Sequence, residues 1–457
     1  MKNQRGHAIV LTYPAQGHIN PLLQFAKRLA SKGLRTTFST THYSLKSILT
    51  TTVGLEPISD GFDEGGFNQA PSLEAYLESF KLVGSTTLSE IIEKFNGSDS
   101  PVNCVVYDSL LPWALDVAKK FNVYAVAFLT NSASICSLYW HIDRGNSSFL
   151  AMQETEPVLL PGLPPLGFSE MPSFLVQPQN HSAYLALIME KFGRLEENDW
   201  VFCNSFEELE SELVKALEGL WPLKMVGPMV PSAYLDQQIE GDKAYGANLW
   251  KPSTEQTLTW LDKNPLKSVI YISFGSMADV SSKQVEEIAW GLKASEKPFL
   301  WVLKEPEKKL SNGFLDSTGE RGLVVNWCNQ LEVLAHKAVG CFVSHCGWNS
   351  ALEAISLGVP IVAVPQWSDQ PMNAKFVEEV WGVGVRAMRN EEGIVGREEI
   401  EKRIREVMEG EKTGGISSNA LKWREAAKKA VSSGGSSDEN VNSFVKKLKE
   451  EKNEMAD

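Results

Sequence analysis

Short apolar runs alternate along this chain with longer stretches in which apolar residues recur every three or four positions. Runs of Val, Ile, Phe and Ala are typical of strands buried on both faces, and the longer period is typical of amphipathic helices. The alternation predicts an α/β fold with parallel sheets covered by helices. In the first half the predicted strands are HAIVLTY (7–13), RTTFST (35–40), LEPIS (55–59), VNCVVYD (102–108), VYAVAFLT (123–130) and VFCNSF (201–206). In the second half they are SVIYISF (268–274), FLWVLK (299–304), GLVVNW (322–327), GCFVSH (340–345), IVAVPQ (361–366) and GVGVRA (382–387).

The segment between the two halves is polar and has no regular period, which favours an exposed linker. We therefore predict a first domain over 1–235, a linker over 236–252 and a second domain over 253–435. Residues 436–457 form a charged amphipathic helix that either packs on the first domain or frays as a tail. An earlier helix, over 19–33, is expected to begin near Pro21.

Composition narrows the possible functions. The 57 acidic and 44 basic residues give a net charge of -13, which repels nucleic acid. No apolar run reaches the roughly 20 residues of a membrane span. The first apolar run is broken by Pro14 and Gly17, so it does not resemble a secretory signal. The six scattered cysteines are typical of a reducing environment, and we expect a cytoplasmic protein, monomeric by default. The His and Cys spacings contain no HxxxH or CxxC, so we expect no metal.

One segment of the second half combines several groups that suit a phosphorylated ligand. A predicted strand ends at His345, and Asn349 and Ser350 stand ahead of a helical stretch that ends at Gly358. A helix N-terminus presents unpaired backbone N–H groups to phosphate, and these three side chains can add hydrogen bonds. The alternative is that Asn349 and Ser350 only cap the helix.

The surrounding residues extend this ligand to a nucleotide sugar. Glu353, one helical turn after Asn349, can accept hydrogen bonds from a ribose diol. Trp327 follows a predicted strand and can stack on a base. Asp369 and Gln370 follow another strand and offer partners for hydroxyl groups.

The first half supplies a candidate base. His18 follows the first predicted strand and Asp108 ends another, and parallel strands end at the same sheet edge. A histidine oriented by a carboxylate can take a proton from an alcohol. The alternatives are a structural His18 and an Asp108 that caps the helix near 112–120.

The segment 327–370 resembles the signature box of plant family-one UDP-dependent glycosyltransferases. The shared positions are Trp327, Gln330, His336, His345, Cys346, Gly347, Asn349, Ser350, Glu353, Gly358, Pro360, Pro365, Asp369 and Gln370. Flanking segments such as 17–29 and 269–276 resemble a subgroup that acts on small carboxylic acids, phenolics, terpenoids or steroids. The chain departs from the usual pattern at Asn329, where Pro or Ala is common, and at Ala351, where Thr is common.

The resemblance implies a GT-B fold, with two Rossmann-like domains facing across a cleft. It implies an inverting glucosyltransferase of plant secondary metabolism that uses UDP-glucose as co-substrate and no cofactor. By the same resemblance His18 is the base and Asp108 orients it. The implied donor contacts are Trp327, Cys328 and Gln330 with uracil, Glu353 with ribose, His345, Asn349 and Ser350 with the diphosphate, Trp348, Asp369, Gln370 and Thr130 with the sugar, and Ser276 with the nucleotide. By the same resemblance, Gln370 implies glucose rather than galactose as the sugar.

The acceptor site is expected on loops of the first domain, which vary freely without disturbing a fold. We expect Phe62, Trp113, Phe128 and Tyr184 to line it and to bind a small lipophilic acceptor. The sequence leaves open which acceptor is used and whether the product is an ester or an ether. The alternatives to a transferase are a nucleotide-sugar epimerase and a non-catalytic UDP-sugar-binding protein.

Overall fold

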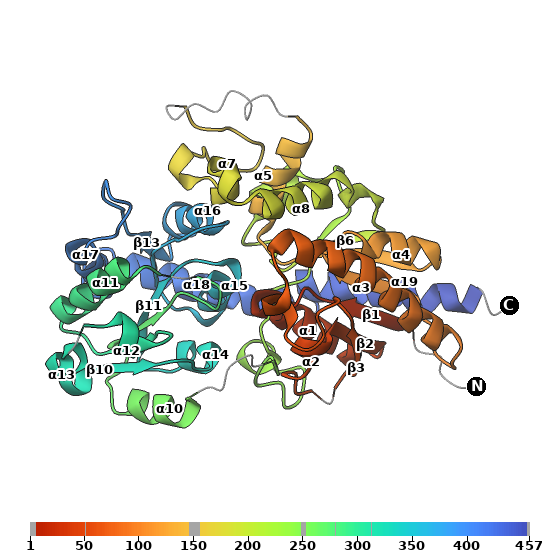
Figure 1. Ribbon diagram of the computed structural model, residues 1–457. Helices are drawn as coiled ribbons and strands as arrows, with labels where there is room; N and C mark the ends of the chain where they lie inside the picture. Colours follow the sequence, from red (N-terminus) through yellow and green to blue (C-terminus); the bar gives the residue numbers. More distant parts are fainter. Residues whose placement is uncertain are drawn as a thin grey trace.

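The computed structural model contains two parallel sheets, one in each half of the chain (Figure 1). It describes residues 6–50, 52–145, 156–247, 253–278, 280–311 and 313–454. The first sheet has the order β3-β2-β1-β4-β5-β6-β7 and the second β10-β9-β8-β11-β12-β13. The strands are β1 (His7–Leu11), β2 (Arg35–Thr41), β3 (Gly54–Ile58), β4 (Cys104–Asp108), β5 (Tyr124–Leu129), β6 (Trp200–Cys203), β7 (Leu223–Met225), β8 (Val269–Ser273), β9 (Phe299–Val302), β10 (Gly322–Val325), β11 (Val339–Ser344), β12 (Ile361–Ala363) and β13 (Gly384–Arg386).

Helices cover both faces of each sheet. They are α1 (Gln16–Ser31), α2 (His42–Leu45), α3 (Leu73–Asn96), α4 (Ala114–Lys120), α5 (Ala133–Asp143), α7 (Ser173–Val176), α8 (Ser182–Gly193), α9 (Ser211–Ala216), α10 (Thr254–Asp262), α11 (Ser282–Ser295), α12 (Pro306–Lys309), α13 (Phe314–Thr318), α14 (Gln330–Leu334), α15 (Trp348–Leu357), α16 (Gln370–Lys375), α17 (Arg397–Met408), α18 (Thr413–Val431) and α19 (Ser436–Glu454). Short turns of helix are η1 (Gly66–Gln69), η2 (Phe168–Glu170), η3 (Pro178–Asn180), η4 (Leu195–Glu197), η5 (Ser232–Tyr234), η6 (Gly319–Arg321) and the π-helix η7 (Phe376–Val380).

The twelve predicted strands are all present, and the central ones, such as β1, β4 and β8, are buried along their whole length. In β1, Ile9 and Leu11 pack into one core cluster, whereas Ala8 and Val10 pack into the cluster on the opposite face. The sequence missed β7, which has only three residues and includes Lys224. The α/β class with parallel sheets is confirmed.

Helix α1 begins earlier than the sequence predicted. It starts at Gln16, so Pro21 lies in its interior rather than at its start. Proline has no backbone N–H, so the carbonyl four residues before it, at Gly17, receives no helical hydrogen bond. The side-chain amide of Asn349, from the second half, donates to that carbonyl. The proline thereby leaves the start of α1 free to contact the other domain.

The predicted linker is largely exposed over its described residues, as expected, but two of its aspartates are held against the first domain. Asp236 and Asp242 form ion pairs with Arg28 and Lys27 of α1, at 2.8 and 2.9 Å. These pairs hold the segment against the first domain, even though its sequence is polar and aperiodic. Its last residues, 248–252, lie outside the described residues.

Helix α19 returns to the first domain, as one of the two alternatives predicted (Figure 1). Its Val441, Phe444 and Leu448 are buried in the same cluster as Ala8 and Val10 of β1. Hydrophobic burial of one helical face therefore fixes the C-terminal helix on the first sheet.

Candidate active site between the two domains

A cavity of about 300 Å³ lies at the carboxyl ends of both sheets. In each sheet the order of the strands reverses at one point, between β1 and β4 in the first and between β8 and β11 in the second. Open parallel sheets bind ligands at such points. His18 follows β1, and Ser276 and His345 follow β8 and β11, and all three line the cavity.

His18 and Asp108 lie in direct contact. Nδ1 of His18 is 2.7 Å from Oδ2 of Asp108, and Thr130 Oγ1 is 3.3 Å from the same nitrogen. Asp108 is fully buried and also accepts the backbone N–H groups of Tyr13 and Leu110, at 3.3 and 3.0 Å. The capping alternative for Asp108 is wrong, because α4 begins after Trp113. The carboxylate fixes the orientation of the imidazole at the cavity wall.

Asn349 and Ser350, which we expected to bind phosphate, stand at the start of α15, but their side chains do not cap the helix. The N-cap is Gly347, and no side chain caps the helix. Asn349 instead bonds to Gly17, and Ser350 Oγ accepts from Gln330 Nε2 at 3.0 Å. The first backbone hydrogen bond runs from Ala351 N–H to Gly347 O at 3.0 Å, so the preceding N–H groups face outward. The capping interpretation of Asn349 and Ser350 is therefore wrong.

His345 packs between two glycines. A Cβ atom on Gly275 or Gly347 would lie 2.8 or 2.6 Å from Nε2 of His345. Gly275 also has φ +73°, which a side chain rarely adopts. Burial lowers the pKa of His345 to about 4. The imidazole is therefore neutral at pH 7 and carries one N–H donor.

Glu353 is the centre of a hydrogen-bonded group on α15. Its carboxylate accepts from Tyr245 Oη at 2.9 Å and from Gln330 Nε2 at 2.8 Å. Burial raises the pKa of Glu353 to about 7, although the two hydrogen bonds oppose this rise. Trp327 and Cys328 line the cavity beside this group. The residues predicted to contact the uracil ring and the ribose thus lie together.

The loop before α16 places Asp369 and Gln370 in the cavity wall. Gln370 Oε1 accepts the backbone N–H groups of Gln366 and Trp367 at 2.8 and 3.1 Å. Asp369 accepts from Asn131 of the first domain at 3.2 Å. Burial raises the pKa of Asp369, and the hydrogen bonds it accepts oppose the rise.

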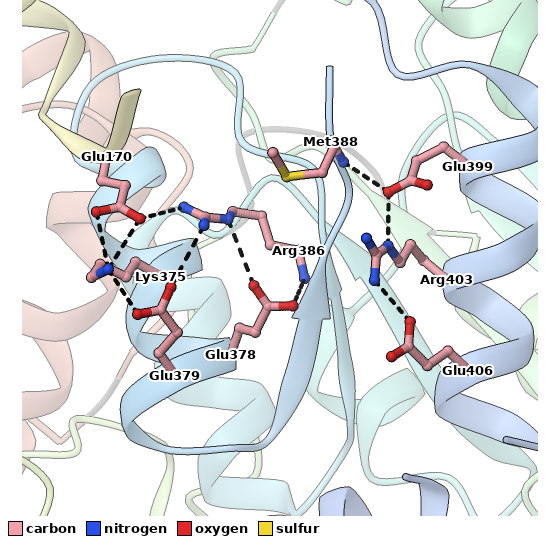
Figure 2. A network of polar contacts seen from close by, with 9 residues as sticks. All are labelled: Glu170, Lys375, Glu378, Glu379, Arg386, Met388, Glu399, Arg403 and Glu406. Atoms are coloured by element: carbon pink, nitrogen blue, oxygen red, sulfur yellow. Dashed lines mark hydrogen bonds and ion pairs between the residues drawn. The ribbon is translucent and has the colours of Figure 1, made fainter. Parts of the chain in front are cut away.

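Helix α16, which follows this loop, and strand β13 are held from the first half by a set of bonds around Glu170 (Figure 2). Glu170 lies 3.0 Å from Nζ of Lys375 and 3.1 Å from Nη1 of Arg386, both in the second domain. Burial opposes its ionisation, yet the Gly167 N–H and these two cations hold the pKa of Glu170 below its ordinary value. Two further bonds join Ser173 and Ser368, at 2.7 and 2.9 Å.

All of the predicted donor-binding residues line the cavity, including Trp348, whose indole donates to Asn204 O at 2.8 Å. Of the four residues expected around the acceptor, only Tyr184 lines it. Phe128 instead faces α1 and packs on Phe25 at 5.2 Å. Trp113 packs on Phe80 at 5.6 Å and Phe62 stacks on Tyr76 at 5.9 Å. Those three expectations are wrong. Phe128 points to the face of β5 that packs on α1, and Trp113 and Phe62 pack on other rings inside the first domain, so none of the three lines the cavity.

Sequence reasoning missed several residues of the cavity wall. They are Tyr13, Asn131, Tyr139, Phe174, Ile188, Lys191, Tyr245 and Trp367. Tyr13 and Asn131 follow β1 and β5 directly, so their position at strand ends was a usable signal. Trp367 follows the predicted strand 361–366 and carried the same signal. The others come from helices and from the predicted linker, where the sequence pattern gives no such indication.

Two features are absent from the described residues. No group of three or more His, Cys, Asp or Glu side chains there is arranged to hold a metal ion. No helix in the same part of the chain is long and apolar enough to cross a bilayer.

Comparison with known proteins identifies the class. The family model for UDP-glucoronosyl and UDP-glucosyl transferases matches residues 87–415. UDP-glycosyltransferase 74B1 of Arabidopsis thaliana is 46% identical over 97% of this chain and 98% of its own length. Flavonol 7-O-beta-glucosyltransferase UGT74F1 of the same plant is 45% identical over 98% and 99%, respectively. Mogroside I-E synthase of Siraitia grosvenorii is 42% identical over 97% and 98%.

Solved structures agree with this result. Os79 from O. sativa in complex with UDP superposes with a TM-score of 0.90 at 39% identity, over 96% of this chain and 100% of that one. The same protein in complex with U2F and trichothecene gives a TM-score of 0.86 at 38% identity, over 96% and 100% of the two chains. The chain belongs to the plant family-one UDP-glycosyltransferases. It is an enzyme of this class with the GT-B fold, which confirms the resemblance and the fold expected from the sequence.

Proposed function

We propose that this enzyme is an inverting glucosyltransferase. It moves glucose from UDP-glucose to a hydroxyl or carboxyl group of a small lipophilic plant metabolite, and gives a beta-glucoside or a glucose ester. The observation that carries the proposal is the 2.7 Å contact between His18 and Asp108 at the wall of a cavity that Trp327 and Glu353 also line. A base thus faces the same space as the groups suited to a nucleotide.

The donor is held by the second domain. Trp327 stacks on uracil, with Gln330 and the Cys328 backbone beside it, and Glu353 accepts from the ribose hydroxyls. The outward N–H groups at the start of α15 bind the diphosphate together with Asn349, Ser350 and His345. Ser276 adds a contact to the nucleotide. Trp348, Asp369, Gln370 and Thr130 surround the sugar, and Gln370 favours glucose.

The chemical step is a single displacement at the anomeric carbon. The acceptor oxygen forms a bond to that carbon while the bond from the carbon to the UDP oxygen breaks, which inverts an alpha-linked donor. Nε2 of His18 takes the acceptor proton, because Asp108 holds Nδ1 as the protonated nitrogen. The leaving diphosphate is stabilised by the N–H groups of α15 and by neutral His345. A carboxylate acceptor brings no proton and depends less on His18.

The acceptor occupies the part of the cavity lined by the first domain. That wall includes Tyr139, Phe174, Tyr184 and Ile188, which suit a lipophilic molecule. The relatives support this choice, since one is named for a flavonol and another has been solved with a trichothecene. A nucleotide-sugar epimerase would have no use for this apolar wall.

The test is mass spectrometry of products from UDP-glucose and UDP-galactose with phenolic, carboxylate, terpenoid and steroid acceptors. His18→Ala is expected to lower transfer to hydroxyl groups about 10²- to 10⁴-fold, the usual contribution of a general base. His42→Ala, at an exposed position, is the matched control. Interconversion of the two UDP-sugars without any acceptor would indicate the epimerase. Binding of UDP-glucose without any product would indicate a binding protein.

A further inference from the structure

Lys191 is a charged residue in a part of the cavity wall that is otherwise aromatic and apolar. On α8, Tyr184, Ile188 and Lys191 follow at i, i+4 and i+7, so they share one face of the helix, and all three line the cavity. Helix α5 packs against α8 and contributes Ile135 and Tyr139 to the same wall. Lys191 is the only Lys or Arg among the described residues that line the cavity.

Burial makes this charge unusual. Lys191 is 5% exposed, and its Nζ lies 4.6 Å from the centre of the Phe192 ring. Its ammonium makes no hydrogen bond or ion pair with any residue that the structure describes. The ring attracts the charge but leaves three N–H donors with no acceptor among the described residues. A buried ammonium in this state is costly unless a further group pairs with it.

The other buried lysines show what such a residue normally has. Lys27 and Lys375 are each 6% exposed. Lys27 donates to Asp242 at 2.9 Å and to Ala244 O at 2.8 Å, and Lys375 pairs with two glutamates. Lys191 alone among these three faces a cavity, which indicates that its partner comes with a ligand.

One candidate partner inside the first domain is already engaged. Glu210 is 4% exposed, and both lysine and glutamate act electrostatically on the thiol of Cys136. The carboxylate of Glu210 accepts the backbone N–H groups of Ala133 and Ser134 at 3.1 and 2.8 Å, and the Ser134 hydroxyl at 2.6 Å. Glu210 therefore holds the start of α5 rather than pairing with Lys191.

We propose that Lys191 binds a carboxylate of the acceptor that is not itself glucosylated. The natural acceptor is then a hydroxy acid of lipophilic skeleton, with its hydroxyl at His18 and its carboxylate at Lys191. This inference rests on the proposed glucosyltransferase function and names its substrate class. The carboxylate takes no part in the bond changes: the hydroxyl oxygen bonds to the anomeric carbon, UDP departs, and the proton goes to His18.

The experiment compares matched acids and esters. Initial rates with UDP-glucose are measured for 4-hydroxycinnamic and 4-hydroxybenzoic acid and for their methyl esters. The readout is the ratio of kcat/KM for acid over ester. In Lys191→Met this ratio should fall about 10- to 100-fold, mainly through KM, because a buried charge pair is lost. Lys191→Arg retains the charge and should keep most of the preference.

Two controls separate charge recognition from damage to the fold. Lys81→Met removes an exposed lysine that pairs with Glu190 of the same helix α8, and should leave the ratio unchanged. A folding defect in Lys191→Met would lower both rates and spare the ratio. The acid products should survive mild alkali, which cleaves glucose esters, and so should carry the glucose on the hydroxyl.

Each remaining outcome decides between the two proposals. Wild type that prefers the esters, an unchanged ratio in Lys191→Met, or products cleaved by alkali would overturn the carboxylate proposal while glucosyl transfer stands. If no acid and no ester is glucosylated although UDP-glucose binds, the proposal for Lys191 fails together with the proposed function.

Discussion

The two walls of the cavity are built in different ways. The donor wall is polar, and its side chains are bonded to one another before any ligand binds: Gln330 connects Ser350 with Glu353, and Tyr245 holds the same carboxylate. The wall where we propose that the acceptor binds, the acceptor wall, consists mainly of rings and aliphatic groups such as Tyr139, Phe174 and Ile188, with Lys191 as the one cation among its described residues.

This difference determines which residues of the cavity can be substituted without loss of ligand binding. A preformed set of hydrogen bonds fits one ligand and loses affinity when any member changes. An apolar wall on helices and loops accepts substitutions, which alter the shape of the space without leaving buried polar groups unpaired. Under the proposed function, the donor wall determines the reaction class and the acceptor wall determines which molecule is modified.

The largest effect on activity is expected at the pair His18 and Asp108, which we propose as the catalytic base and the residue that orients it. Asp108→Asn places an amide N–H₂ group against Nδ1 of His18 and favours the wrong tautomer. We expect kcat with hydroxyl acceptors to fall about 10²- to 10⁴-fold, by analogy with carboxylate loss in a catalytic triad. Steady-state kinetics at saturating UDP-glucose measures it. Asp116→Asn, on the next helix and more than half exposed, serves as control. A fully active Asp108→Asn enzyme would remove Asp108 from the mechanism.

On the donor wall, Glu353→Gln should raise the Kd for UDP-glucose about 10- to 100-fold at alkaline pH, because a charged hydrogen-bond acceptor is lost. The ribose hydroxyls favour ionised Glu353, and its pKa in the free protein is about 7. Wild-type affinity should therefore fall as the pH drops through about 7, while Glu353→Gln shows no such dependence. Calorimetry between about pH 6 and pH 8 measures both. Parallel profiles for the two proteins would contradict this assignment.

The contact around Glu170 tests whether the first half holds α16, and with it the preceding loop 365–369, in place. Glu170→Gln leaves Lys375 and Arg386 with a neutral partner, and should cost about 2 kcal/mol of stability in urea unfolding. Because the folded pKa of Glu170 is lowered, the advantage of wild type should be complete above the ordinary value of 4.5 and vanish at lower pH.

The same variant should raise the KM for UDP-glucose a few-fold, roughly 2- to 5-fold, since Asp369 lies on that loop and Gln370 begins α16. Glu212→Gln removes a solvent-exposed pair with Lys215 and should change stability by less than about 0.5 kcal/mol. Equal effects of the two variants would show that the contact to the second domain has no special role.

The smallest effect is expected on the acceptor wall. Tyr184→Phe keeps the ring stacked on Phe174 at 5.7 Å and removes only the hydroxyl, which lies near Tyr13. We expect acceptor KM values to change about 2- to 10-fold, in a direction that depends on the acceptor. The KM for UDP-glucose should change by less than about twofold. A larger change in the KM for UDP-glucose than in the KM for acceptors would contradict the assignment of the two walls to donor and acceptor.

Much of the donor site was predictable because its residues lie close together in the sequence. From Trp327 to Gln370 they follow successive strands of one sheet, and each strand delivers its next residues to the same edge. The acceptor wall was not predictable in this way. Phe128 and Tyr184 are both apolar and aromatic, but only the packing of β5 against α1 shows that Phe128 faces away from the cavity.

The amino-acid sequence alone determined the α/β class, the positions of the twelve predicted strands and the identity of the groups that suit a nucleotide sugar. These are local properties, since period, strand ends and residue type are read within a few positions. Only the tertiary structure decided that two aspartates of the polar linker pair with α1, that Pro21 leaves the Gly17 carbonyl to Asn349, and that Lys191 faces the cavity without a partner among the described residues. Each of these depends on contacts between residues far apart in the chain, which no local pattern encodes.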